Sequence, residues 1–416
     1  MFFEARLESA LQHWQRQPEN IPLRLELWNG RQFDLSPTPR VTIRLPSRSA
    51  LLAFLAPTLS RLAEAYIEGK IEIQGAVRDT IEVADQLTRR RQSAPTPVPF
   101  WRRTSHTRRA DADAIQYHYD VSNDFYQLWL DRRMVYSCAY FRTGDEDIHT
   151  AQEQKLDHIC RKLMLKPGEQ LLDIGCGWGA LAVWAAHNYG VHVTGITPSR
   201  NQYEHARAWA EREGLADRIE IRLQDYRDVP GREVFDKIVS VGMFEHVGLR
   251  KLPNYFATVS RLLRDGGWVM NHGITSMDPD SREVGRGGGE FIDRYVFPQG
   301  ELPHLALAIR EMSRQGLEVT DVESLRAHYA QTLWHWTTRL EQQQQLAEAH
   351  AGSKRYRVWL LYLAGCAWGF EHGWISIHQI LAHKTKRNGV SGAPWTREHL
   401  YSETATATAA RVRIST

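Results

Sequence analysis

The chain has 416 residues and a net charge of +3, and 42% of its residues are hydrophobic and 10% aromatic. This composition is that of a folded protein and excludes an intrinsically disordered chain, while the length exceeds one ordinary hydrophobic core and predicts two domains. The longest apolar run, Trp359 to Phe370, has twelve residues. A helix needs roughly 20 apolar residues to cross a bilayer, so we expect no membrane-spanning segment.

The cysteines and the first residues bear on the cellular compartment. The four cysteines are Cys138, Cys160, Cys176 and Cys366. Their spacing shows no CxxC pair and no histidine-rich partner, which argues against a zinc or other metal site and against a secreted disulfide framework. The opening MFFEARLESAL carries Glu4 and Glu8 and lacks a basic region, so it does not resemble a signal peptide. We therefore expect a cytoplasmic protein.

Residues 1–93 predict a small α+β domain. Alternating apolar residues in LRLELW, RVTIRL and KIEIQG indicate strands, and an amphipathic helix is expected over the apolar positions Leu51, Leu52, Phe54, Leu55, Leu59, Leu62 and Tyr66. This region has no paired carboxylates, no serine and histidine grouping and no glycine loop. Binding or docking is the expected role, with a purely structural role as the alternative.

A basic, proline-containing linker is expected at residues 94–112. Between Arg89 and Arg109 the chain has seven arginines and no acidic residue, around the segment SAPTPVPFW. Such a stretch cannot build a core and is typical of a domain connector. It is either a solvated spacer or a contact with an anionic membrane surface, where each basic side chain contributes about 1 kcal/mol. We expect no nucleic-acid partner, because no zinc finger, RNP-like or helix-turn-helix pattern occurs elsewhere.

Beyond the linker, strands alternate with helices, which predicts a doubly wound, mainly parallel α/β sheet. The expected strands are Gln170 to Ile174, His192 to Ile196, Ile219 to Leu223, Asp236 to Val241, Trp268 to His272, and Leu317 to Val322.

The first of these strands runs into LLDIGCGWG, with Gly175, Gly177 and Gly179 at alternate positions. Glycines allow a tight turn and a close approach of the backbone to a ligand, and the helix that follows offers free N–H groups. The spacing is GxGxG rather than GxGxxG, and the next strand ends without the acid that binds a ribose in NAD enzymes. Together with Asp173 and the later QDY, this pattern favours an S-adenosylmethionine methyltransferase.

From about His118 to the C-terminus the chain resembles the cyclopropane fatty acid synthases and the related mycolic acid cyclopropane synthases. The matching blocks are HYDVSNDFYQLWL, MVYSCAYF, AQEQKLDHI, LLDIGCGWG, GITPSRNQ, QDYRD, SVGMFEHVG, NHGIT, FIDRYVFPQGELP and ESLRAHYAQTLWHW. The smaller N-terminal domain is similar to the lipid-facing domain of full-length bacterial cyclopropane synthases. The resemblance implies a Rossmann-like S-adenosylmethionine-dependent methyltransferase domain over residues 113–400, followed by a tail at 401–416.

The resemblance also implies where the cofactor S-adenosylmethionine binds. Tyr136 and Ser137 would lie at its amino acid end, Gly175 and Gly177 beneath it, Thr197 and Gln202 toward its ribose, and Asp225 and Tyr226 around its adenine, with Asp173 also in the site. A carboxylate at the adenine is chemically sound, because it accepts a hydrogen bond from an exocyclic N–H.

For the reaction, the resemblance implies that an alkene attacks the sulfonium methyl and that a bound bicarbonate ion takes the proton from the resulting carbocation. The implied ligands of this ion are Cys138, Glu245, His272, the backbone of Ile274, and Tyr329. Taken singly, Glu245 is compatible with a local hydrogen-bond partner, His272 with a core histidine, and Tyr329 with packing. Cys138 alone could be a nucleophile, a metal ligand, half of a disulfide or packing, and the resemblance makes it a neutral wall and weak donor.

The expected function is transfer of a methylene group to the cis double bond of an unsaturated phospholipid acyl chain, by a homodimer at the inner face of the membrane. Alternatives are a methyl-branched or methylene fatty acid product, an amine N-methyltransferase and a noncatalytic lipid-binding protein. Aromatic residues after the sheet, including Trp334 and Trp374, could line an acyl channel or form ordinary core. The loop SREVGRGGGEF is expected to act as a lid.

Overall fold

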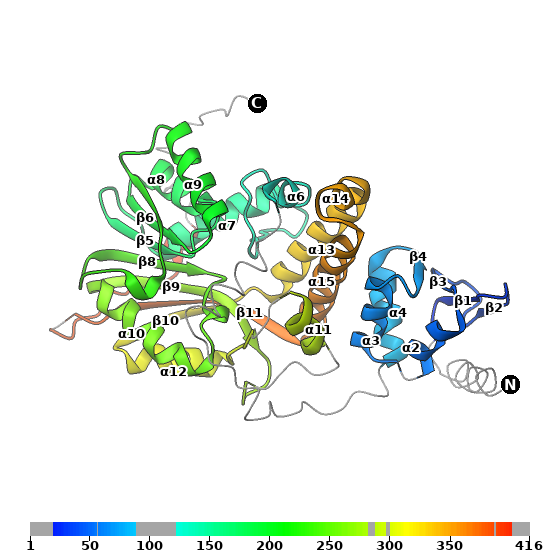
Figure 1. Ribbon diagram of the computed structural model, residues 1–416. Helices are drawn as coiled ribbons and strands as arrows, with labels where there is room; N and C mark the ends of the chain where they lie inside the picture. The colour runs from blue at the N-terminus through cyan, green and yellow to red at the C-terminus, as the bar shows by residue number, and fades with distance from the viewer. Residues whose placement is uncertain are drawn as a thin grey trace.

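The computed structural model describes residues 20–55, 57–88, 122–281, 288–296, 300–386 and 388–401 (Figure 1). Within this part the chain forms a small N-terminal sheet with its helices and a larger mixed sheet with helices on both faces. The expected linker, its seven arginines and the tail after residue 401 lie outside the described residues. The same holds for residues 282–287 of the expected lid, so these expectations stay predictions.

The N-terminal sheet has the strand order β2-β1-β3-β4, in which β1 and β3 are parallel and the other pairs antiparallel. Its strands are β1 (Leu23–Leu27), β2 (Gln32–Asp34), β3 (Val41–Leu45) and β4 (Glu72–Gln74). Every second residue of β1 and β3 is buried, as the alternating pattern predicts. The three expected strands are confirmed, and the short β2 was not expected.

The single helix expected between Leu51 and Tyr66 is wrong, because the chain forms three shorter pieces. These are η1 (Arg48–Leu51), α2 (Leu52–Leu55) and α3 (Leu59–Ile67), followed by α4 (Val77–Thr88). Pro57 separates α2 from α3, since proline lacks the N–H that a helix interior requires. Thr58 caps α3 by accepting a hydrogen bond from the Arg61 N–H at 3.2 Å.

The large sheet has seven strands in the order β10-β11-β9-β8-β5-β6-β7. They are β5 (Gln170–Ile174), β6 (His192–Thr197), β7 (Ile219–Leu223), β8 (Phe235–Val241), β9 (Leu263–Ser276), β10 (Leu317–Ser324) and β11 (Ile375–Lys384). The run from β9 to β7 is parallel, and β11 is antiparallel to both β9 and β10. All six expected strands and the α/β fold class are confirmed, whereas β11 was missed.

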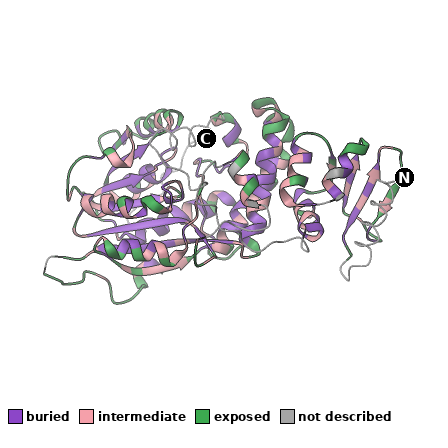
Figure 2. Ribbon diagram, turned by 60° about the horizontal axis from the view of Figure 1, so that its bottom comes forward, coloured by how far each residue is buried: buried purple, intermediate pink, exposed green. Residues whose placement is uncertain are grey.

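Helices cover both faces of this sheet, whose strands are mainly buried (Figure 2). On one face lie α7 (Ile148–Lys162), α8 (Ala180–Tyr189) and α9 (Arg200–Arg212). On the other lie α10 (Leu252–Leu262) and α12 (Leu305–Arg314). Shorter elements complete the domain: α6 (Asn123–Gln127), η4 (Tyr226–Asp228), η5 (Phe244–His246), η6 (Leu249–Lys251) and α16 (Glu398–Tyr401). The carboxyl ends of the parallel strands, where α/β proteins bind ligands, are thus left for a site.

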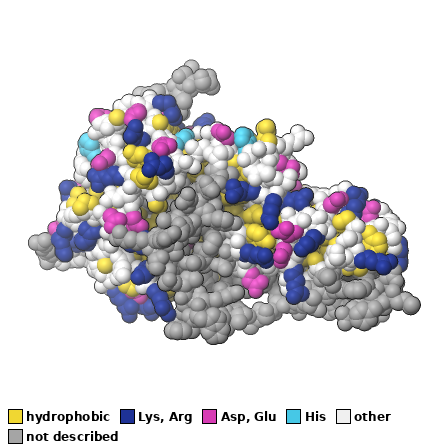
Figure 3. Space-filling view, in the orientation of Figure 1, with side chains coloured by type: hydrophobic (Ala, Val, Ile, Leu, Met, Phe, Trp, Pro, Cys, Tyr) yellow, Lys and Arg dark blue, Asp and Glu magenta, His cyan; other side chains and the backbone are white. Residues whose placement is uncertain are grey.

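A helical layer separates the large sheet from the N-terminal domain. It consists of α11 (Gly288–Tyr295), α13 (Arg326–Gln342), α14 (Gln344–Ala351) and α15 (Ser353–Glu371). Helix α15 packs against α3 and α4, and ion pairs join Lys354 to Glu68 and Arg78 to Glu371, each at 2.8 Å. Figure 3 shows basic and acidic side chains close together where the domains meet. No helix in the described ranges is both long and apolar enough to cross a membrane.

Candidate active site

The glycine loop between β5 and α8 has a backbone that only glycine adopts readily. Gly175, Gly177 and Gly179 have φ angles of 83°, 56° and 96°. A Cβ on Gly177 would meet no atom within 4 Å, whereas one on Gly179 would lie 2.9 Å from the Cβ of Ala206. Gly179 therefore allows α8 and α9 to pack closely, and Gly177 leaves open space above the loop.

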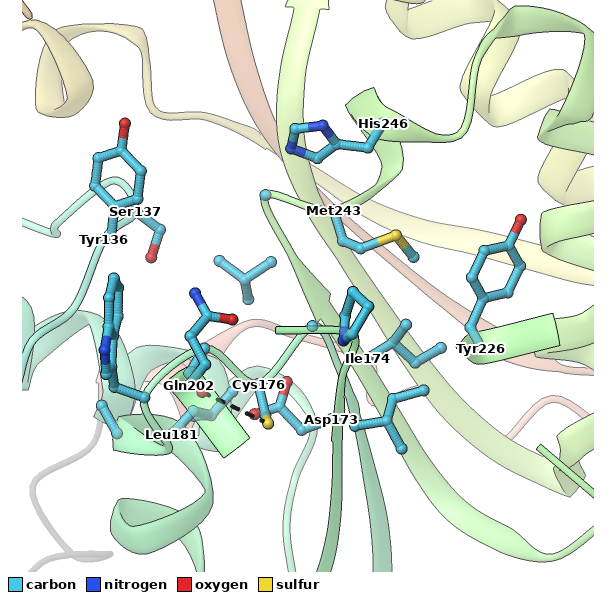
Figure 4. Close-up of a pocket in the computed structure, with 18 of the residues that line it drawn as sticks. Tyr136, Ser137, Asp173, Ile174, Cys176, Leu181, Gln202, Tyr226, Met243 and His246 are labelled. Atoms are coloured by element: carbon cyan, nitrogen blue, oxygen red, sulfur yellow. Dashed lines mark hydrogen bonds between the residues drawn. The ribbon is translucent and has the colours of Figure 1, made fainter. Parts of the chain in front are cut away.

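That space belongs to a cavity at the carboxyl ends of β5, β6 and β8, which we call the cofactor cavity (Figure 4). Eight of the nine residues expected to bind the cofactor line it: Tyr136, Ser137, Asp173, Gly175, Gly177, Gln202, Asp225 and Tyr226. Figure 4 shows Tyr136 and Ser137 on one side, Tyr226 on the other and Asp173 at the base. The ninth, Thr197, lies behind the wall and donates a hydrogen bond to Gln202 Oε1 at 2.8 Å.

A buried lysine that the sequence analysis did not single out also lines the cofactor cavity. Lys155 on α7 donates a hydrogen bond to Ser137 Oγ at 2.9 Å. Burial lowers the pKa of Lys155 to about 8 and raises the pKa of Asp173 to about 7, while the Lys155 charge acts to lower the latter. Asp173 Oδ2 has no hydrogen-bond partner in the described part of the chain. This end of the cavity can therefore bind both an ammonium and a carboxylate group.

The sequence does carry a signal for Lys155. It lies in AQEQKLDHI, one turn after the fully buried Ala151 and beside the buried Leu156. A lysine on the buried face of an amphipathic helix is uncommon and calls for an anionic or polar partner.

The carboxylate expected at the adenine already has a partner. Asp225 Oδ1 accepts hydrogen bonds from the backbone N and from Nε of Arg227, each at 2.9 Å, and Oδ2 accepts from Nη2 at 2.6 Å. Arg227 also lines the cofactor cavity and was not predicted. Asp225 is thus held in place by Arg227.

Glu245, His272 and the Ile274 backbone come together at the ends of β8 and β9, and we call this group the anion cradle. Ile274 N donates a hydrogen bond to Glu245 Oε1 at 2.6 Å, so it holds this carboxylate in place. Glu245 Oε2 is buried without a partner in the described residues, and burial raises the pKa of this carboxyl group to about 7. Glu245, His272 and Ile274 do not line the cofactor cavity, whereas His246 and Val247, which follow Glu245 in the chain, do.

The orientation of His272 depends on β11, the strand missed from sequence. Gln379 pairs with His272 across β9 and β11, and its Nε2 lies 3.3 Å from His272 Nδ1. Burial lowers the pKa of His272 well below its usual value, so the ring is neutral. His272 Nε2 is buried and has no partner in the described part of the chain.

Cys138 and Tyr329 pack near Leu325 in the same hydrophobic core. The Cys138 thiol donates to the carbonyl of Ala139 at 3.2 Å and lies 3.8 Å from that of Leu325, and the Tyr329 N–H donates to Leu325 O at 2.9 Å. Burial raises the pKa of the Cys138 thiol far above its usual value. A thiolate nucleophile is therefore disfavoured, and Cys138 is free rather than in a disulfide. No group of three or more possible metal ligands occurs in the described residues.

Comparison with known proteins identifies the family. Residues 106–380 match the family described as Mycolic acid cyclopropane synthetase. The chain is 51% identical over 397 residues to a "Probable fatty acid methyltransferase" of Pseudomonas putida, covering 95% of this chain and 99% of that protein. The chain belongs to the mycolic acid cyclopropane synthetase family.

Two further relatives of the cyclopropane synthetase family define the enzyme type. The chain is 41% identical over 275 residues to the cyclopropane-fatty-acyl-phospholipid synthase of Escherichia coli, covering 66% of this chain and 68% of that one. It superposes with a TM-score of 0.62 on mycolic acid cyclopropane synthase CmaA1 complexed with SAH and CTAB, with 34% identity, covering 66% of this chain and 98% of that chain. The protein is thus an S-adenosylmethionine-dependent methyltransferase of the cyclopropane synthase type. Residues 10–107 match a domain of unknown function, DUF7884.

Proposed function

We propose that this protein transfers a methylene group from S-adenosylmethionine to the cis double bond of an unsaturated acyl chain in a membrane phospholipid, with a bound bicarbonate ion as the proton acceptor. The observation that supports the ion is the anion cradle. Glu245 and His272 each bury one polar atom without a partner in the described residues. Leaving such atoms unpaired costs about 1–3 kcal/mol each, so a bound polar ion would stabilise the site.

The cradle can hold this ion with a defined proton arrangement. Neutral His272 would donate from Nε2, and ionised Glu245 would accept the ion's own O–H. Bicarbonate supplies, when bound, an oxygen that takes a proton from the reacting chain. Cys138 and Tyr329 would complete its surroundings as a weak thiol donor and a hydroxyl donor. The Ile274 N–H would act through Glu245, because it already donates to that carboxylate.

Gln379 would fix which nitrogen of His272 carries the proton. If the Gln379 amide donates to His272 Nδ1, that nitrogen is the acceptor and Nε2 carries the hydrogen. The donor then lies at the nitrogen without a partner. A neutral imidazole with the opposite proton placement would present a lone pair to an anion and would repel it.

The aromatic core beside the cofactor cavity suits a reaction that passes through a carbocation. Tyr136 lines the cavity, and its ring lies 5.4 Å from Trp336 and 5.5 Å from Trp129, centroid to centroid. As the alkene forms a bond to the methyl carbon and the carbon–sulfur bond breaks, positive charge develops on the acyl chain. Aromatic faces stabilise a cation, and a dry wall keeps water from trapping it before a methyl proton is lost and the ring closes.

The proposal includes the setting in which the enzyme works. We place it in the cytoplasm as a homodimer bound peripherally to the inner face of the membrane, where the arginines between residues 89 and 109 would contact anionic headgroups. This part rests on the sequence and on the family relationship. Replacing the seven arginines with glutamine should weaken vesicle binding, and more so at low salt.

The test is incubation of the protein with S-adenosylmethionine and vesicles of a dioleoyl phospholipid, followed by mass spectrometry and proton NMR of the fatty acids. A gain of one CH₂ with upfield cyclopropane proton signals supports the proposal. No mass gain on any lipid, with methylation of an added amine, would instead show an amine N-methyltransferase.

A methyl-branched product is the second candidate, because the Pseudomonas putida relative is named a fatty acid methyltransferase. The same carbocation leads to a methylene-branched chain if the proton leaves from the new methyl group without ring closure. This isomer has the same mass but shows vinylidene signals in the NMR spectrum. A saturated methyl-branched chain is two hydrogens heavier and requires an added reductant.

A further inference from the structure

A second cavity lies between the N-terminal domain and the helical layer of the catalytic domain, and we call it the interdomain cavity. The N-terminal wall comes from β3, β4, α3 and α4, and the opposite wall from α11 and α15. Its lining includes Ala63, Ile81, Ile292, Gly365 and Trp374. The few polar residues of its lining include Thr80, whose hydroxyl donates to Ala76 O at 3.1 Å, and the buried Asp85. The walls are therefore almost wholly apolar.

The interdomain cavity is next to the catalytic core. Tyr362 on α15 lines it and also packs in the aromatic core that contains Tyr136 and Tyr329. The Trp359 ring lies 5.8 Å from the Tyr362 ring and 6.1 Å from the ring of Tyr136, centroid to centroid, and Tyr136 lines the cofactor cavity. Tyr362 thus stands between the two cavities, with the N-terminal domain on one side and the cofactor on the other.

Two glycines on α15 keep the interdomain cavity open. Gly365 and Gly369 lie one turn apart on the cavity side of this helix, and neither has a positive φ. Glycine is unfavourable in the interior of a helix, and the backbone of α15 does not require it at these two positions. A Cβ on Gly365 would meet no atom within 4 Å, and one on Gly369 would meet only Trp374 and Ile375 at ordinary contact distances. The missing side chains therefore leave room that the protein itself does not fill.

We propose that the interdomain cavity binds one acyl chain of the lipid substrate, so that the N-terminal domain forms half of the path to the cofactor. This inference rests on the proposed function. Apolar walls with few polar partners disfavour a headgroup or ordered water and suit a hydrocarbon chain. Contacts across the interface hold the two walls together, since Arg357 Nη1 donates to Tyr66 O at 3.0 Å and Glu341 accepts from the Val77 N–H at 2.9 Å.

The test introduces a large side chain into the interdomain cavity from each of its two walls. Gly365→Phe and Ala63→Phe place a ring in the space proposed for the acyl chain, and Gly365→Ala and Ala63→Ser are the matched small controls. We expect at least about a tenfold loss of lipid methylation in the two Phe variants, because a displaced double bond no longer meets the cofactor methyl. The two small variants should lose much less activity than the Phe variants, because a methyl or hydroxyl group occupies far less of that space. Cofactor affinity, measured with S-adenosylhomocysteine, should be unchanged in all four.

Direct binding separates this inference from the proposed reaction. The fluorescent fatty acid cis-parinaric acid should bind the wild-type protein and Gly365→Ala but not Gly365→Phe, whether or not a lipid is methylated. Wild-type binding and turnover in both Phe variants would overturn the acyl cavity and leave the proposed function intact. A wild-type protein that binds the probe in a Gly365-dependent way yet methylates no lipid would overturn the reaction and support the cavity.

Discussion

The cofactor cavity and the anion cradle differ in how far their polar groups are hydrogen-bonded within the protein. In the cofactor cavity, Asp225 pairs with Arg227, and Ser137 accepts from Lys155. In the cradle, Glu245 and His272 are buried and each retains one polar atom with no partner in the described residues. The cavity is thus held in shape by its own hydrogen bonds, whereas the cradle has two buried polar atoms that the proposed ion would pair.

This difference predicts separable defects. A change in the cradle should lower turnover and leave cofactor affinity intact. A change at the Asp173 end of the cofactor cavity should weaken cofactor binding and leave turnover at saturating cofactor intact. Asp173 is the intermediate case, because it lines the cavity but keeps Oδ2 without a partner in the described part of the chain.

The largest effect is expected from the cradle itself. Glu245→Gln turns the free acceptor into a donor, and His272→Ala removes the donor, so each should lower turnover by about 10²–10⁴-fold. Affinity for S-adenosylhomocysteine, measured by calorimetry, should stay at the wild-type value. Equal loss of affinity and turnover would show that the two residues serve the fold rather than the reaction.

The cradle also predicts a pH dependence of turnover. Burial raises the pKa of Glu245 to about 7, and only the ionised form can accept the ion's O–H. Below that pH the group is protonated, so the rate at saturating cofactor should fall by about tenfold per pH unit. A pH–rate profile, with the bicarbonate concentration held constant, measures this fall in rate. A flat profile from about pH 5.5 to about pH 7, the range just below this pKa, would contradict the role of Glu245.

At the end of the cavity where we expect the methionine part of the cofactor, Asp173→Asn should weaken cofactor binding by roughly 10–100-fold, since a hydrogen bond to a charged group contributes about 1.5–3 kcal/mol. Asp225→Asn is the matched control at the adenine end. Its effect should be smaller, because both oxygens of Asp225 already accept from Arg227. Titration with S-adenosylhomocysteine gives both values, and the reverse order of effects would exchange the roles of the two carboxylates.

The fold was largely predictable because its strands are short apolar runs bounded by turns. The strand β11 was missed because His378 and Gln379 interrupt its apolar pattern and it follows the long helix α15. The break between α2 and α3 was missed although Pro57 marks it. Both features depend on local chemistry or tertiary pairing, which the hydrophobic pattern of the sequence does not carry.

The residues of the site also differ in whether the sequence alone can predict them. Glycine spacing, together with the resemblance, placed eight expected residues at the cofactor cavity, because these motifs are local in sequence. Gln379 and His272 are separated by 107 positions and meet only through sheet register. Arg227 gave no signal because its role depends on the side chain two residues earlier. Lys155 does carry a signal in the sequence, which is a charge on a buried helix face.

A smaller effect is expected for Gln379, which acts on the reaction only through His272. Gln379→Met keeps the length of the side chain and removes the donor, so both neutral forms of the ring become accessible and turnover should fall by roughly tenfold, the loss of one buried hydrogen bond. Nitrogen-15 NMR of histidine-labelled protein, with His272→Gln as the assignment control, should show the Nε2–H form in the wild type and a mixture in the variant. An Nδ1–H form in the wild type would refute this role.

The smallest effect is expected for Cys138. Its thiol is buried, its pKa is far above the usual value, and its single hydrogen donates to Ala139 O. It therefore acts first as a neutral wall, and it would be a weak donor to the proposed ion only by giving up that hydrogen bond. Cys138→Ser keeps a donor of similar size and should lower turnover less than Cys138→Ala, with neither change exceeding about tenfold. Both variants should bind S-adenosylhomocysteine normally. A covalent adduct on Cys138 during turnover, detected by mass spectrometry of the intact protein, would make this residue a nucleophile and would require a different account of the cradle.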